Sequence, residues 1–122
     1  MSLNKYEKLV VWQKGYNLVL KIYQLTKSFP KEEIYGITNQ LRRSASSICA
    51  NIVEGHKRGD KEFIRYLNIA RGSLEETSYH LRLSKDLGYC SLEQYTNLIH
   101  TIDEIGKMLY RLKQTLALKT EG

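Results

Sequence analysis

A chain of 122 residues has room for one domain with a single hydrophobic core, because such domains commonly contain about 100–150 residues. Hydrophobic residues make up 42% and charged residues 26% of the chain, a balance that excludes an intrinsically disordered protein and predicts a packed core. Nineteen Lys and Arg against thirteen Asp and Glu give a net charge of +6. This excess favours nucleic acid or an acidic protein surface as a partner, although a solvated basic surface would explain it equally well.

The sequence does not indicate a membrane protein. The N-terminal residues MSLNKYEKL lack the long apolar region of a secretory signal, and no uninterrupted apolar run approaches the roughly 18–20 residues of a membrane span. We therefore expect a cytoplasmic protein without a membrane partner.

Apolar residues recur at spacings of three and four in four long blocks, and no sustained alternation of period two occurs. The chain is therefore predicted to be helical throughout, with helices at about residues 10–29, 31–54, 61–87 and 92–118. Short loops between four amphipathic helices make neighbouring helices antiparallel. The sequence thus predicts an all-α protein, an antiparallel up-down-up-down four-helix bundle that forms one domain over residues 1–122.

The first two helices are separated by Pro30, which is predicted to lie at the first turn of the second helix. The core stripe of the first helix is predicted to be Val11, Trp12, Tyr16, Leu18, Val19, Ile22, Tyr23 and Leu25. That of the second helix is predicted to be Ile34, Ile37, Leu41, Ala45, Ile48 and Ile52. Gly55 is predicted to end the second helix in a left-handed conformation, since glycine has no Cβ to clash.

The third helix is predicted to begin at Asp60 as the N-cap and to end at Gly88. Its apolar repeat is Phe63, Leu67, Ala70, Leu74, Thr77, Leu81 and Ser84. Ser91 and Gln94 have the spacing of a capping box for the fourth helix. The stripe of the fourth helix is predicted to be Leu92, Tyr95, Ile99, Ile102, Leu109, Leu112 and Leu116.

Three stretches of the chain resemble a known family. They are LVVW at residues 9–12, IYGITNQLRRSASSICANIVEG at residues 34–55 and IARGSLEE at residues 69–76. On these stretches, and over nearly the whole chain, the sequence resembles the four-helix-bundle proteins encoded within intervening sequences of bacterial 23S ribosomal RNA genes.

The resemblance implies a four-helix protomer that assembles as a homopentamer around a central channel, without an established enzymatic activity and with a role near nucleic acid. A similar bundle is the accessory protein of diversity-generating retroelements, where it partners a reverse transcriptase. We therefore expect a noncatalytic oligomer that associates with RNA or a ribonucleoprotein. The alternative is a protein-interaction module, such as a reverse-transcriptase accessory subunit, whose partner the sequence does not identify.

The second helix carries a polar stripe on the side away from its apolar stripe. At 100° per residue, a narrow arc contains Gln40, Arg43, Ser47, Asn51 and Glu54. Because two organised faces imply two kinds of neighbour, these residues are predicted to form a subunit interface. An exposed polar face is the alternative.

Basic residues gather where the second helix passes to the third. The candidate nucleic-acid-binding residues are Lys57, Arg58, Lys61, Arg65 and, further along the third helix, Arg71. Such groups attract phosphate backbones with an affinity that falls steeply as salt rises. However, Glu54, Asp60 and Glu62 compensate part of this charge, and no RNA-binding signature is present. A turn kept soluble by its charges is therefore the alternative.

No arrangement of residues predicts a catalytic or metal site. Ser73 and His80 share a face of the third helix, but two helical turns, or roughly 10 Å, separate them, which is too far for proton transfer. His56 and His100 fall in other helices without a partner at metal-ligand spacing. We therefore expect no enzymatic activity, no metal and no cofactor.

The two cysteines are not predicted to form a disulfide. In the expected topology Cys49 and Cys90 lie near opposite ends of the bundle, whereas bridged cysteines have Cα atoms within about 7 Å.

Overall fold

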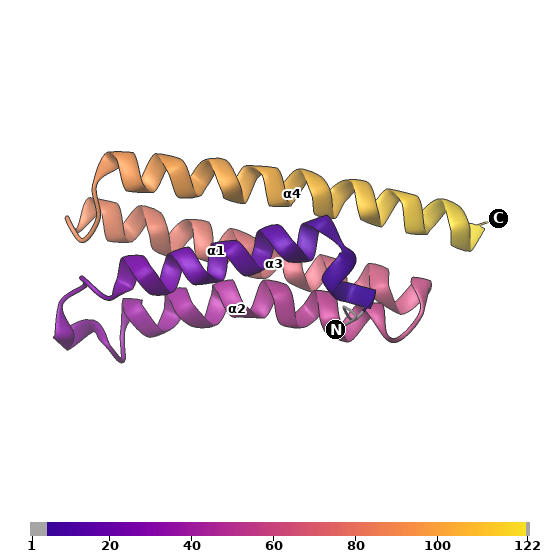
Figure 1. The fold of residues 1–122 in the computed structure, drawn as a ribbon, viewed down its shortest axis with the longest axis horizontal. Coiled ribbons are helices and arrows are strands. Elements are labelled where there is room, and N and C mark those ends of the chain that lie inside the picture. The colour runs from indigo at the N-terminus through magenta and orange to yellow at the C-terminus, as the bar shows by residue number, and fades with distance from the viewer. Residues whose placement is uncertain (1–4, 122) are drawn as a thin grey trace.

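The computed structural model describes residues 5–121, so the ends of the predicted domain, residues 1–4 and 122, lie outside the described residues. Its elements are, in order, η1 (Lys5–Lys8), α1 (Val10–Thr26), η2 (Lys31–Glu33), α2 (Ile37–His56), α3 (Asp60–Asp86) and α4 (Leu92–Glu121). Across residues 5–121 no strand is present, and the four long helices lie side by side, joined at alternating ends (Figure 1). The predicted all-α four-helix bundle is confirmed.

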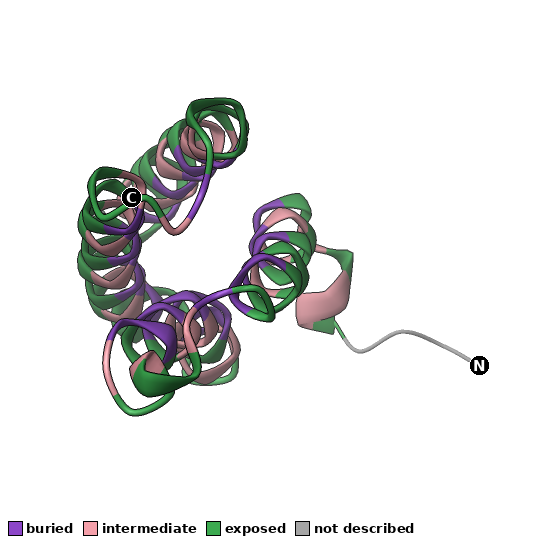
Figure 2. Ribbon diagram, turned by 90° about the vertical axis from the view of Figure 1, so that its left-hand side faces the viewer, coloured by how far each residue is buried: buried purple, intermediate pink, exposed green. Residues whose placement is uncertain are grey.

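The helices follow one another around the bundle in chain order. Each helix packs against the next, and α4 returns to α1, so the buried faces point inward when the bundle is seen along its axis (Figure 2). The α2–α3 contact is the most extensive of these and the α1–α4 contact the least. The centre is formed by fully buried residues from all four helices, which include Leu18, Leu41, Ile48, Leu67 and Ile105.

The connection between α1 and α2 is longer than predicted. α1 ends at Thr26 instead of about residue 29, and α2 begins at Ile37 instead of about residue 31. Pro30 has an extended conformation, with φ −54° and ψ 139°, and it precedes only the short 3₁₀ turn η2. Gly36 then has a non-helical backbone conformation, with φ −108° and ψ −121°, so the regular helix begins only after it.

Gly55 does not end α2, contrary to the prediction. It is a buried helical residue, and a Cβ built on it would lie 2.6 Å from Cβ of Tyr66 and 2.8 Å from Cδ1 of Phe63. Glycine is therefore needed here for close helix packing. The reversal of the chain occurs at Gly59, whose φ of 94° lies in the region that favours glycine.

Two of the three helix-end predictions for α3 and α4 are confirmed. Gly88 follows α3 with φ 81°. The amide of Gln94 donates to Oγ of Ser91 at 3.0 Å, and the amide of Ser91 donates to Oε1 of Gln94 at 2.9 Å, which is the predicted capping box. The Asp60 cap is wrong, because Asp60 is the first helical residue and the cap position belongs to Gly59, which offers no side chain.

The predicted core is correct along α3 and partly wrong elsewhere. All seven residues of the α3 repeat are buried. The residues that are exposed instead of buried are Tyr16, Tyr23, Ile34 and Leu92. Ile34 precedes α2 and Leu92 is the first residue of α4, so both lie at the ends of the bundle. In α1, Gly15 is buried, and a Cβ on it would lie 3.0 Å from Sγ of Cys49. The side of α1 that contains Gly15 therefore faces α2 closely, and Tyr16 and Tyr23 lie at the edges of this contact, where they are exposed.

The α2–α3 seam combines apolar packing with a row of small polar groups. Oγ1 of Thr77 lies 2.8 Å from Oγ of Ser44, and the Ser73 hydroxyl donates to Oγ of Ser47 at 2.9 Å. The amide of Asn51 donates to the carbonyl of Ser47 at 2.8 Å and to its Oγ at 3.0 Å. Small side chains let the two backbones approach, and each buried hydroxyl finds a partner.

An ion pair links α1 and α4. Nζ of Lys14 lies 3.1 Å from Oε2 of Glu104, and its hydrogen bond lowers the pKa of the Glu104 carboxyl below its ordinary value. A lowered pKa in the folded state favours folding at pH values above the ordinary carboxyl pKa. This contribution is lost as the pH falls through the folded-state pKa.

Replacing Lys14 with glutamine is expected to raise the Glu104 pKa toward its ordinary value, because the charged donor is removed. NMR titration of the side-chain carboxyl carbon measures this change directly. Lys21→Gln, at an exposed lysine of the same helix, is the control and should leave the Glu104 titration unchanged. A Glu104 midpoint that does not move in Lys14→Gln would contradict the assignment.

Candidate nucleic-acid interface

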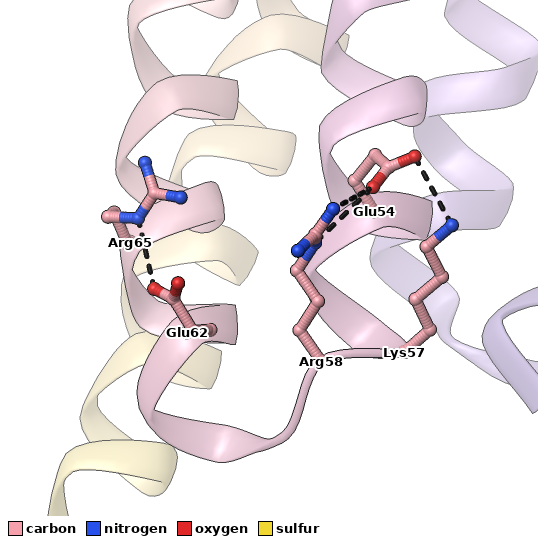
Figure 3. Close-up of polar contacts among 5 residues, drawn as sticks. All are labelled: Glu54, Lys57, Arg58, Glu62 and Arg65. Carbon is pink, nitrogen blue, oxygen red and sulfur yellow. Dashed lines mark hydrogen bonds and ion pairs between the residues drawn. The ribbon is translucent and has the colours of Figure 1, made fainter.

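The α2–α3 turn comprises the last residues of α2, the linker at residues 57–59 and the first turns of α3. The amide of Arg58 donates to the carbonyl of Gly55 at 3.1 Å, and the amide of Phe63 donates to the carbonyl of Gly59 at 2.9 Å. Together with the tight packing of Phe63 on Gly55, these bonds bring the start of α3 directly against the end of α2. The basic side chains of the two helices are thereby held at one end of the bundle (Figure 3).

Two carboxylates order this basic group. Glu54 accepts from Nη2 of Arg58 at 3.1 Å through one oxygen, and its other oxygen lies 3.4 Å from Nζ of Lys57. Glu62 accepts from Nε of Arg65 at 3.0 Å (Figure 3). The hydrogen bonds from Arg58 and Lys57 lower the pKa of Glu54, and the bond from Arg65 lowers the pKa of Glu62. The predicted local compensation of charge is therefore present.

Tyr66 contacts both arginines of the turn. The guanidinium carbon of Arg58 is 5.3 Å from the centre of the Tyr66 ring, and that of Arg65 is 4.7 Å from it. Both cations are thus held on an aromatic side chain as well as on a carboxylate. The sequence identifies Tyr66 only as one of several tyrosines, with Tyr79 and Tyr89, that could lie near the surface and stack on unpaired bases. Its contacts with Arg58 and Arg65 were not predicted.

The structure brings together four of the five candidate binding residues. Lys57, Arg58, Lys61 and Arg65 all belong to the turn or to the first turns of α3, and all are exposed. Arg71 pairs with Glu75 at 3.5 Å and lines a separate hollow of about 660 Å³ between α3 and α4. It therefore lies outside the turn cluster, because six residues along a helix rotate a side chain well away from the starting face.

The predicted polar stripe of α2 divides into two parts. Gln40 and Arg43 are exposed, whereas Ser47 and Asn51 are half-buried in the seam with α3, and Glu54 is bonded to the turn. Part of the stripe thus serves contacts within the chain. Its role as a subunit interface remains a prediction.

The two cysteine side chains lie inside the bundle. Cys49 and Cys90 are both free and buried, and burial raises the pKa of the Cys49 thiol to about 12. Within residues 5–121 no group of three or more His, Cys, Asp or Glu side chains is arranged to hold a metal ion. Among the described helices, none is both long and apolar enough to cross a membrane.

The comparisons with known proteins agree with the fold. The family model for the 23S rRNA-intervening sequence protein matches residues 7–111. A crystal structure of a protein with unknown function from the S23 ribosomal protein family of Bacteroides thetaiotaomicron VPI-5482 is similar, with 30% identity and a TM-score of 0.76 over 85% of this chain and 98% of that chain. Comparison with curated proteins finds no match. Since the family model covers most of the chain, the protein belongs to the 23S rRNA-intervening sequence protein family.

Proposed function

We propose that this protein is a noncatalytic binding protein that associates with RNA or a ribonucleoprotein through the α2–α3 turn. The observation that carries the proposal is the exposed pair of arginines, Arg58 and Arg65, whose guanidinium groups both lie against the ring of Tyr66. Lys57 and Lys61, both exposed, add two further cations at the same turn. The net charge of +6 on the whole chain favours the same polyanionic partner.

The ion pairs of the turn do not remove its capacity to bind phosphate. Glu62 is bonded to Arg65 through Nε, and a guanidinium has further donors that can form bonds to a phosphate. Arginines that are already ordered also lose less conformational freedom when they bind. The carboxylates therefore set the geometry of the cations while lowering the strength of nonspecific attraction.

Reversing the charges of the turn is expected to weaken RNA binding at least about tenfold at moderate salt, because several phosphate contacts are lost together. The variant is Lys57→Glu, Arg58→Glu and Lys61→Glu in one chain. Fluorescence anisotropy of a labelled structured RNA, titrated at two salt concentrations, measures the affinity and its salt dependence. Circular dichroism checks that the variant remains helical.

The matched control carries the same number of reversals elsewhere, at the exposed residues Lys21, Lys107 and Lys119. It is expected to retain most of the affinity. Equal losses in both variants would mean that only net charge matters and that the turn is not the binding surface. Absence of salt-sensitive RNA binding by the unaltered protein would remove RNA association as the function.

A second candidate function is a protein-interaction module, supported by one exposed face of α3. Ile69, Tyr79 and Leu83 are exposed there, and Gly72 lies among them. A Cβ placed on Gly72 would have open space around it, with no neighbouring atom within 4 Å. An apolar face with an open glycine suits another helix packing against it. The partner would be a second copy, as in the implied homo-oligomer, or a polymerase.

Light scattering and recovery of partners from the native cell distinguish the two functions. The interaction module would be favoured by a defined oligomer that does not bind RNA, together with a protein partner whose association persists after nuclease treatment. Salt-sensitive RNA binding that depends on the turn would favour the first function.

A further inference from the structure

A second basic site lies on the α1–α2 side of the bundle. It is a hollow of about 620 Å³, and Tyr23, Tyr35, Asn39, Arg42 and Arg43 are among its lining residues. Arg42 precedes Lys57 by fifteen residues along the chain, so about 22 Å of helix separates this hollow from the α2–α3 turn. The volume falls within the roughly 300–1,000 Å³ that is typical of small-ligand sites.

The arginines of this hollow differ from those of the turn in their partners. Within the described residues, Arg42 and Arg43 form no ion pair, whereas the arginines of the turn and of α3 each pair with a carboxylate. No Asp or Glu lines the hollow. Its positive charge is therefore uncompensated at close range, which favours an anionic ligand.

Arg42 is fixed by the fold. Its Nε donates to Oγ1 of Thr26 at 2.9 Å, and Thr26 is itself buried at 3% exposure. The guanidinium carbon of Arg42 lies 4.7 Å from the centre of the Tyr23 ring. A cation held by a buried hydroxyl and an aromatic face is ordered before any ligand arrives.

Tyr35 supplies an aromatic face that the fold itself does not use. It lies in the connection between η2 and α2 and is 93% exposed. An aromatic ring left in water contributes nothing to the core, but it offers a surface on which a planar group can stack.

A smaller hollow of about 270 Å³ continues the site. It shares Ile34, Thr38 and Arg42 with the first hollow, and it adds Lys27 and Lys31 from the α1–α2 connection. The two hollows together form a basic track beside exposed aromatic rings. A track longer than one ligand site suits a chain of phosphates better than a single phosphate group.

We propose that this track, which we call the Tyr35 groove and define by Tyr23, Tyr35, Arg42, Arg43 and Lys31, binds single-stranded nucleic acid. An unpaired base stacks on Tyr35, and neighbouring phosphates contact Arg42 and Arg43. The inference rests on the proposed association with RNA and adds to it a preference for unpaired strands, since a duplex already stacks its bases internally. The α2–α3 turn then supplies attraction to phosphate, and the groove supplies selection for unpaired bases.

Replacing Tyr35 with alanine is expected to weaken binding of a labelled single-stranded oligouridine about tenfold, whereas Tyr35→Phe keeps the stacking face and the affinity. Arg43→Gln should lower the slope of log affinity against log salt by about one, because one phosphate contact is lost. The controls are Arg82→Gln, an exposed arginine of α3, and an RNA duplex as ligand. The duplex should bind unaltered protein and Tyr35→Ala equally.

The outcomes separate this inference from the proposed function. If the turn variant loses RNA binding while Tyr35→Ala and Arg43→Gln bind the single strand like the Arg82→Gln control, the groove is overturned and RNA association stands. If the unaltered protein binds neither RNA, both fail. If uridine monophosphate competes as effectively as an unlabelled single strand, the ligand of the groove is a free nucleotide and the proposal of a single strand is overturned. If an acidic peptide competes as effectively as the single strand, the groove binds an acidic protein segment and the proposal is likewise overturned.

Discussion

Replacing Gly55 with alanine is expected to lower the free energy of unfolding by about 2 kcal/mol, although alanine is the better helix former by about 1 kcal/mol. The added Cβ would lie 2.6 Å from Cβ of Tyr66 and 3.3 Å from Cα of Phe63. Both atoms are at or next to the backbone, so a rotamer change cannot relieve the clash and α3 must move away from α2. Urea unfolding at one fixed protein concentration measures the loss.

Gly106→Ala is the matched control, because Gly106 is also a helical glycine. A Cβ on Gly106 would lie 3.5 Å from Cδ2 of Leu74, an ordinary contact distance. Stability should therefore stay unchanged or rise by up to about 1 kcal/mol. A Gly55→Ala protein as stable as the Gly106→Ala protein would contradict the close α2–α3 packing.

Truncating Ile105 to alanine is expected to lower the free energy of unfolding by about 2–5 kcal/mol, since its side chain is fully buried and its removal leaves a cavity. The loss is comparable to a large part of the stability of a small domain, which is about 5–15 kcal/mol. Thermal and urea unfolding both measure it.

The matched substitution is Leu92→Ala, at a residue of the same helix that is 68% exposed. It is expected to change stability by no more than about 0.5 kcal/mol. Leu92 belongs to the stripe predicted from the sequence and Ile105 does not, so the pair tests which of these two residues packs in the core. A larger effect at Leu92 than at Ile105 would contradict the burial of Ile105 and the exposure of Leu92.

The accuracy of the core prediction follows the environment of each helix. α3 is enclosed by α2 and α4, so its apolar repeat and its buried face coincide. α4 meets α3 and, less extensively, α1. The predicted stripe omitted Leu98 and Ile105, which lie about 20° apart at 100° per residue, on the same face as Ile102 and Leu109. Leu92 lies about 120° or more from both and at the start of the helix, and it is exposed.

Helix ends were predictable where the signal is local and not where it depends on packing. The Ser91–Gln94 capping box is made by residues three apart, and its spacing is sufficient to identify it. Gly55 and Gly59 look alike in the sequence. Gly55 is needed inside α2 for its close contact with Phe63 and Tyr66 of α3, and the chain reverses at Gly59 instead.

The candidate sites also differ in whether their residues are neighbours in the chain or meet only through packing. Lys57, Arg58, Lys61 and Arg65 gather as predicted because they are neighbours in the chain. The Tyr35 groove was not predicted as a site, because Tyr23 and Arg42 come from different helices and meet only after α1 and α2 pack.

The polar row of the α2–α3 seam holds the two helices in register only weakly. Ser44 also donates to the carbonyl of Leu41 in its own helix, Thr77 lies 2.8 Å from the carbonyl of Ser73, and Asn51 is bonded to Ser47. If α3 slid along α2, these groups would keep partners within their own helices and few would be left unsatisfied. The hydroxyl groups therefore do little to prevent α3 from sliding along α2. This sliding is opposed by the close packing of Phe63 and Tyr66 on Gly55.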